Sequence, residues 1–229
     1  MFAIGFKEFK NLFKSFKSLV VISIIFGVTL GSAKLISIFQ SQLHQLGMND
    51  SPYATGLLII ILLASPLFIF ALSHNAINEE YRSRTIRFIA TKTSRENIIF
   101  GKFFGTLFFW IVCLTIVVIL LTFFSGHFYF SELIQSIIYV SYFIGLTILL
   151  STVISRPGIT GFLGIVLSIA VTIIGLWSIG SKNLLLKIFS YITPYLFYSQ
   201  DNENYTYLVL IFPILFLGLS LMILRRRDL

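Results

Sequence analysis

Residues Asn78–Lys102 read NEEYRSRTIRFIATKTSRENIIFGK, and this polar stretch lies between two long apolar runs. It contains five Arg and Lys residues before Ile98. A stretch with so many charges is too polar to cross a lipid bilayer, and it is too short to form a separate domain. We therefore expect it to lie on one face of a membrane and to serve as a docking surface.

The composition excludes an ordinary soluble domain. Hydrophobic residues make up 57% of the 229 residues and charged residues only 11%, whereas roughly a quarter of a soluble domain is charged. The mean hydropathy is +0.94, which predicts an integral membrane protein. The net charge of +8 is confined to short segments between apolar runs, so membrane topology explains it better than nucleic-acid binding. The single cysteine, Cys113, allows no disulfide or cysteine-based metal site within one chain.

The N-terminus has two interpretations. Its basic opening, the apolar run Leu19–Leu30 and the small residues Gly31–Ala33 imitate a secretory signal with its cleavage site. We expect the segment to be retained and to form the first membrane span.

An amphipathic helix is predicted for residues 1–17. Phenylalanines recur at spacings of three and four along one face, and lysines recur at similar spacings along another. Such a helix lies in the membrane interface, with its lysines toward anionic lipid and its rings at the acyl boundary. The predicted anchor residues are Phe6, Lys7, Phe9, Lys10, Phe13, Lys14, Phe16 and Lys17.

Apolar runs long enough to cross a bilayer occur six times. About 20 predominantly apolar residues are needed for one helical span. The predicted spans are residues 18–39, 54–77, 98–124, 133–154, 159–179 and 205–224. The fold class is therefore an all-α membrane protein with six transmembrane helices.

The topology follows from the distribution of the 17 Lys and Arg residues between the spans. One side of the membrane holds Lys7, Lys10, Lys14, Lys17, Arg82, Arg84, Arg87, Lys92, Arg95, Lys102, Arg156, Arg225, Arg226 and Arg227. The other side holds only Lys34, Lys182 and Lys187. Because cytoplasmic segments carry the excess of positive charge, we expect both termini, the segment 78–97 and the turn 155–158 to be cytoplasmic.

The predicted outer segment 180–204 contains apolar residues at helical spacing and a break at Pro194. This pattern is consistent with two short helices that re-enter the outer leaflet. Tyr191, Pro194 and Tyr195 are then candidates for an outer gate. A simple interfacial loop is the alternative.

Several classes of chemistry leave no trace in the sequence. The central apolar stretches of the spans contain no Asp or Glu, which disfavours an ion-coupled carrier. No HExxH pair, G-x-S-x-G elbow or G-x-x-x-x-G-K-[ST] loop occurs. Glu79 and Glu80 precede Arg82, Arg84 and Arg87, so a salt-bridged face of a short helix explains them better than acid–base catalysis, with a solvated loop as the alternative.

The chain resembles the permease subunit of an ABC-2 type transporter over all six spans. The residues that match the family's second cytoplasmic segment are Glu79 or Glu80, Thr85, Ser94, Arg95, Gly101 and Lys102. Arg84 stands where the family has glycine, and Lys92 stands where it has proline. The basic amphipathic start resembles the family's connecting helix, 191–194 resembles its outer re-entrant region, and 226–229 resembles a common ending.

The resemblance implies that segment 78–97 contains a coupling helix that docks on a cytoplasmic ATPase. The implied coupling residues are Glu79, Glu80, Tyr81, Arg82, Arg84, Thr85, Arg87, Phe88, Ser94, Arg95 and Lys102. ATP and Mg are expected on two separate ATPase subunits, and this chain is expected to hold no cofactor and to be no enzyme by itself. A second permease, identical or related, is expected to complete the path, and no nucleic acid is expected as a partner.

The cargo expected from the sequence is an amphipathic or hydrophobic peptide, such as a toxin or an antimicrobial peptide. An apolar, aromatic-rich path without buried charge suits such a cargo better than a sugar or a metal ion. The Phe, Ile, Lys and Asn usage is typical of a low-GC bacterium, so the bacterial cytoplasmic membrane is the expected location. Lipid or drug export by the same machinery, or a scaffold subunit that is not driven by ATP, are the alternatives.

Overall fold

The computed structural model describes residues 1–45, 52–83, 85, 91, 93–200 and 202–226. These residues form helices and the turns that join them. Within them, six helices are long and apolar enough to cross a membrane, as predicted from the sequence. The chain is therefore a multi-pass helical membrane protein.

The described residues of the first half form two short helices and three long ones. Helix α1 covers Phe2–Lys14, and α2 covers Phe16–Gln45 after an extended residue at Ser15. Helix α3 covers Pro52–Ser73, and the short α4 covers Asn78–Arg82. Helix α6, the longest, covers Arg95–Ser125. The amphipathic helix predicted for residues 1–17 thus ends at Lys14 in the structure.

In the second half, the short helical elements lie between the long helices α8 and α11. Helices α7 and α8 cover Phe130–Val153 and Pro157–Ile179. Two short helices, α9 (Leu184–Ile192) and α10 (Tyr195–Tyr198), follow. A 3₁₀ helix, η1, covers Glu203–Leu210 and continues directly into α11, Ile211–Arg226. The sixth predicted span is therefore 3₁₀-helical in its first part.

Helix α7 is the centre of the bundle. It packs against α3, α6 and α11, and 67% of its most apolar window is buried, whereas the value is 22% for α2 and for α8. Its buried side chains include Tyr139, Tyr142 and Phe143. Exposed apolar faces on α2 and α8 are expected where a helix meets lipid or another subunit.

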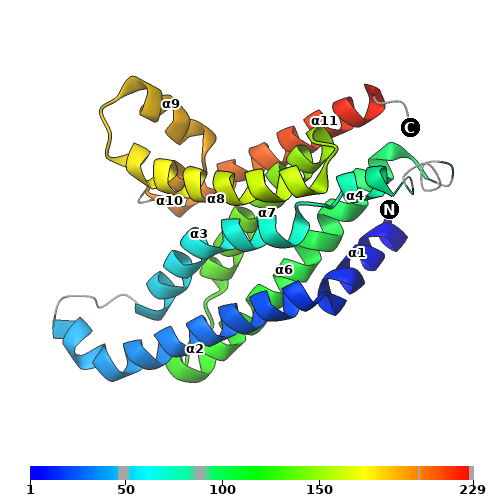
Figure 1. Cartoon of the computed structure of the whole chain (residues 1–229). Coiled ribbons are helices and arrows are strands. Elements are labelled where there is room, and N and C mark those ends of the chain that lie inside the picture. The colour runs from blue at the N-terminus through cyan, green and yellow to red at the C-terminus, as the bar shows by residue number, and fades with distance from the viewer. Residues whose placement is uncertain (46–51, 84, 86–90, 92, 201, 227–229) are drawn as a thin grey trace.

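The short elements gather at opposite ends of the bundle. The N-terminus, α4 and the C-terminal end of α11 lie together at one end, and α9 lies at the other (Figure 1). Three of the segments predicted to be cytoplasmic therefore share one end.

Candidate functional site

The turn that leads from α3 into α4 is fixed by a buried asparagine. Asn78 is 0% exposed, and its Nδ2 donates to Thr160 Oγ1 at 2.6 Å and to the Ile154 carbonyl at 3.2 Å. The backbone N–H groups of Ile77 and Asn78 donate to Ser151 Oγ at 2.9 and 3.2 Å. Because the first N–H groups of a helix lack intrahelical partners, Ser151 on α7 acts as a cap for α4.

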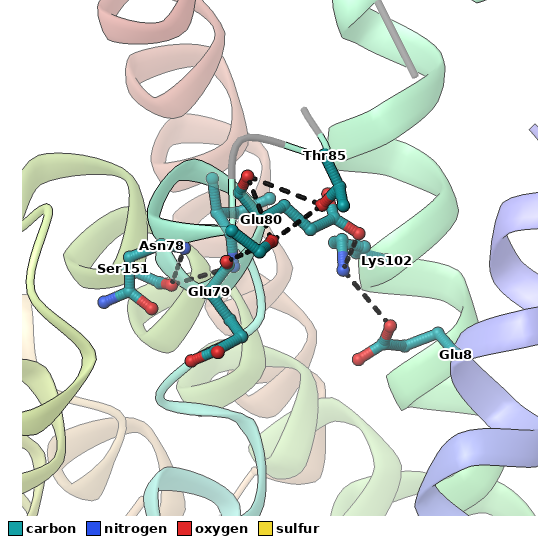
Figure 2. Close-up of polar contacts among 9 residues, drawn as sticks. Glu8, Asn78, Glu79, Glu80, Thr85, Lys102 and Ser151 are labelled. Atoms are coloured by element: carbon teal, nitrogen blue, oxygen red, sulfur yellow. Dashed lines mark hydrogen bonds and ion pairs between the residues drawn. The ribbon is translucent and has the colours of Figure 1, made fainter. Parts of the chain in front are cut away.

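A buried lysine joins three elements at the same end. Lys102 Nζ on α6 lies 2.9 Å from Glu80 Oε1 on α4 and 3.2 Å from Glu8 Oε2 on α1 (Figure 2). The lysine side chain is 6% exposed and each carboxylate side chain 18%. Burial of an ammonium requires such partners, because its desolvation costs several kcal/mol, roughly. We call the region defined by Glu8, Asn78, Glu80, Arg95 and Lys102 the charged end.

The outward side of α4 stays accessible. Glu79, Arg82, Ser83 and Thr85 are exposed, while Tyr81 packs against the hydrophobic core. Glu80 pairs with Lys102 of a distant helix, where the sequence predicts pairing with arginines along its own helix. The predicted partners Arg84 and Arg87, and the predicted coupling residue Phe88, lie outside the described residues.

The start of α6 is tied to the end of α11. Ser94 caps α6, and the Arg95 guanidinium donates to the carbonyls of Leu224 at 2.8 Å and Arg225 at 2.7 Å. Arg225 in turn forms a salt bridge with Glu96. The last carbonyls of a helix have no intrahelical donors, so Arg95 supplies donors and a positive charge to the negative end of α11.

Glycines let α1 lie directly on α6. A Cβ atom on Gly105 would come within 2.5 Å of the Gly5 carbonyl oxygen, and one on Gly101 would come within 2.9 Å of Ile4 Cβ. Both distances are shorter than real Cβ contacts allow. The backbones of the two helices therefore approach each other more closely than larger residues would permit.

This packing changes the role expected for the aromatic face of α1. Phe9 and Phe13 pack against rings of α6 in tilted and edge-to-face arrangements, with centroid distances of 5.1 and 4.8 Å, so they contact protein where lipid was expected. Phe6 and Phe16 are 67% and 79% exposed, and Phe16 belongs to α2. The predicted basic anchors are all exposed: Lys7, Lys10, Lys14 and Lys17.

At the opposite end, a proline creates a need for hydrogen-bond donors. Pro66 inside α3 has no N–H, so the Leu62 carbonyl one turn earlier loses its helical partner. The Tyr139 hydroxyl on α7 lies 2.7 Å from this carbonyl oxygen and the Tyr195 hydroxyl on α10 lies 3.2 Å from it, so either hydroxyl can donate to it. Leu62 lies roughly 15 Å along α3 from its first residue, a depth at which lipid offers no donor.

Tyr195 fills a slot between the long helices. It is 1% exposed, and a Cβ atom on Gly175 of α8 would lie 2.3 Å from its ring. Only glycine at position 175 leaves room for this ring. We call the region defined by Tyr139, Tyr142, Tyr195 and Tyr198 the tyrosine end.

The hydroxyls of the tyrosine end form a chain. Thr172 Oγ1 lies 2.9 Å from the Tyr195 hydroxyl, which lies 2.7 Å from that of Tyr139. Each hydroxyl has one proton. Thr172 donates its proton to the Ser168 carbonyl at 2.8 Å, so Tyr195 donates to Thr172 and Tyr139 donates to the Leu62 carbonyl, and each proton has one acceptor. Burial raises the pKa of Tyr195, so its phenol keeps the proton that this arrangement requires.

The structure places the three predicted outer-gate residues differently, with Pro194 and Tyr195 at the start of α10 and Tyr191 in α9. Tyr195 is buried among α3, α7 and α8, whereas Tyr191 is 56% exposed. Pro194 is the N-terminal cap residue of α10. Tyr142 and Tyr198 hold the neighbouring backbone by donating to the carbonyls of Ile192 and Gln135.

Several residues of the two ends are not among those predicted. Glu8, Asn78 and Tyr139 are the main ones, and each contacts an element far away in the sequence. Weak signals exist for them: Glu8 is the single acidic residue in the basic segment 1–17, and Pro66 interrupts a predicted span. The proline predicts a free carbonyl at Leu62 but not the hydroxyls that reach it.

Among the described residues, His, Cys, Asp and Glu form no group of three able to hold a metal ion. Comparison of the sequence with profiles of known families and with curated proteins found no match. Both the charged end and the tyrosine end hold a short, non-spanning helix firmly against the long helices, and the charged end leaves one side of that helix exposed.

Proposed function

We propose that the chain is the membrane-spanning permease subunit of an ATP-driven ABC-2 type exporter. In this proposal, segment 78–97 docks on a separate cytoplasmic ATPase that binds ATP and Mg. The observation that carries the proposal is the anchoring of α4, whose outward side is exposed. Asn78 binds α7 and α8, and Glu80 binds Lys102 of α6, which also binds Glu8 of α1. A force applied to α4 would reach four other helices through these contacts.

The surface around α4 favours a partner with acidic groups. A hollow of about 710 Å³ lies between α4 and the α7–α8 turn, lined in part by Tyr81, Arg82 and Arg156. Both arginines are exposed, and the lysines of α1 lie at the same end. A partner that inserts a side chain into this hollow gains contact with α4 and with the turn that precedes α8.

Two further elements of the proposal concern assembly and cargo. The exposed apolar faces of α2 and α8 support association with a second permease, identical or related. The cargo we propose is an amphipathic or hydrophobic peptide, exported across the cytoplasmic membrane of a bacterium. This choice rests on the apolar, aromatic-rich character of the chain.

The docking proposal is tested by charge reversal on the exposed side of α4. Glu80 is unsuitable because its replacement breaks a buried salt bridge. We would co-express the full chain with a P-loop ATPase encoded beside it, and compare copurification of the ATPase with wild type, Arg82→Glu and Arg156→Glu. Reversal should weaken copurification at least several-fold, because a favourable charge pair becomes repulsive.

Lys187→Glu is the matched control. It reverses an exposed charge on α9, at the other end of the bundle, and should leave ATPase copurification unchanged. Equal copurification with all four proteins would contradict docking at α4. Cysteine labelling adds an independent measurement: Ser94→Cys should react with a membrane-impermeant reagent only after permeabilisation, and Asn202→Cys should react from outside.

A further inference from the structure

A second cavity at the charged end lies between α1 and the turn that joins α3 to α4. Its volume is about 850 Å³, within the range of small-ligand pockets. Lys102 and its partners Glu8 and Glu80 form one wall. The apolar part of the lining comes from Ala3, Ile4, Leu12, Phe16, Ala71, Leu72 and Ala76. The cavity thus combines charged groups with an apolar surface.

The charges of the lining match a ligand that carries both signs. Lys102 is paired with Glu8 and Glu80, and no salt bridge joins the other lining charges, Lys7, Lys17 and Glu79, to a described residue. Figure 2 shows Glu79 pointing away from Lys102. A purely anionic ligand would be repelled by Glu79 and by the net negative group of Glu8, Glu80 and Lys102. A purely cationic ligand would be repelled by Lys7 and Lys17. A zwitterion avoids both conflicts.

The accessible carboxylate of the lining specifies the cationic group. Glu79 is exposed and no salt bridge joins it to a described residue, whereas Glu80 binds Lys102. A carboxylate oxygen is an acceptor, so it needs an N–H or O–H donor. A primary ammonium supplies N–H groups, whereas a quaternary ammonium has none and is usually held by several aromatic rings. Among the described residues of this lining, Phe16 is the single Phe, Tyr or Trp.

We propose that this cavity binds a phospholipid with a primary-amine zwitterionic headgroup, phosphatidylethanolamine in chemical class. The ammonium lies beside Glu79 and Glu80, and the phosphate lies toward Lys7 and Lys17. The glycerol and the first part of the acyl chains contact Ile4, Leu12, Phe16 and Leu72. The site uses different residues from those tested for ATPase docking, so the two proposals succeed or fail separately.

Native mass spectrometry of the full chain in detergent tests the site. Phosphatidylethanolamine, phosphatidylcholine and phosphatidylglycerol with identical acyl chains would be titrated separately, together with soluble glycerophosphoethanolamine. We expect phosphatidylethanolamine to bind most tightly. Glu79→Gln should weaken its binding roughly two- to fivefold, the effect of losing one exposed charge pair, without weakening that of phosphatidylglycerol.

Lys7→Gln should weaken the binding of phosphatidylethanolamine and phosphatidylglycerol alike, because both contain phosphate. Lys10→Gln is the control, since Lys10 is an exposed residue of α1 that does not line the cavity. Equal affinity for the choline and ethanolamine lipids, or unchanged binding to Glu79→Gln, would overturn the proposal. Equal binding of the soluble headgroup would overturn the assignment to a lipid.

Discussion

The charged end and the tyrosine end solve the same problem with different chemistry. Each fixes a short helix against long ones: α4 through an ammonium between two carboxylates, and α10 through neutral hydroxyls on a carbonyl. Lys102 is the eighth residue of α6, roughly 10 Å along the helix from its start, whereas Leu62 lies roughly 15 Å into α3. The ionised groups are thus paired and lie near the end of a long helix, whereas the neutral hydroxyls bind a carbonyl deeper within the bundle.

The difference predicts how each end responds to loss of one group. A buried ion pair leaves an uncompensated charge when one partner is removed, which costs about 3–5 kcal/mol. In a hydroxyl network, leaving a buried acceptor without a donor lowers the free energy of unfolding by about 1–3 kcal/mol. The charged end should therefore be the more sensitive of the two.

The largest effect is expected for Lys102→Met. This change leaves Glu8 and Glu80 without their shared cation, and we expect it to lower the thermal unfolding midpoint in detergent by roughly 10 °C. The triple variant Lys102→Met, Glu8→Gln, Glu80→Gln removes the charges as well. It should recover most of the loss, and an equally low midpoint would show that packing of Lys102, not charge, stabilises this end.

The next largest effect is expected for Gly105→Ala. Its new Cβ would meet backbone of α1, which cannot move alone, so the whole helix must shift at a cost of about 1–3 kcal/mol. Gly175→Ala should cost less, because the obstacle there is one tyrosine ring. The rate at which a protease cleaves α1 measures this effect, and Gly105→Ala should raise that rate. Gly27→Ala is the control: its new Cβ on α2 would contact no other atom, so cleavage of α1 should be unchanged.

A smaller effect is expected for Tyr139→Phe, about 1–2 kcal/mol, because the Leu62 carbonyl keeps only the longer bond from Tyr195. Pro66→Ala restores an N–H within reach of the same carbonyl. In the Pro66→Ala background, Tyr139→Phe should therefore cost less than it does alone. A double-mutant cycle of unfolding midpoints measures the difference. Additive effects would refute the role assigned to the proline.

The sequence was sufficient to predict the helices that depend on a local pattern of apolar residues. Long apolar runs predict six helices long enough to cross a membrane, since a bilayer imposes one length on each span. The sequence was insufficient to predict which side chains pair with one another across the bundle. Glu8 and Lys102, or Tyr139 and Tyr195, lie on different elements, and no spacing rule within one helix relates them.

The aromatic face of α1 shows why pattern alone can mislead. Rings at helical spacing predict a surface that avoids water, but they do not distinguish lipid from protein. Gly5, Gly101 and Gly105 decide the outcome by letting α6 approach, so that Phe9 and Phe13 are covered by protein. The glycines are visible in the sequence, but their alignment across two helices is a tertiary property.

The smallest effect is expected for Arg95→Gln. Arg95 supplies a positive charge and donors to the last carbonyls of α11, an interaction worth about 0.3–1 kcal/mol near a surface. Amide hydrogen exchange in the last turns of α11 should quicken roughly two- to fivefold, with no change in α10. Arg95→Lys keeps the charge and should retain part of the protection. Unchanged exchange in both variants would show that Arg95 does not stabilise the C-terminal end of α11. The charged end would then consist of the contacts of Asn78 and Lys102.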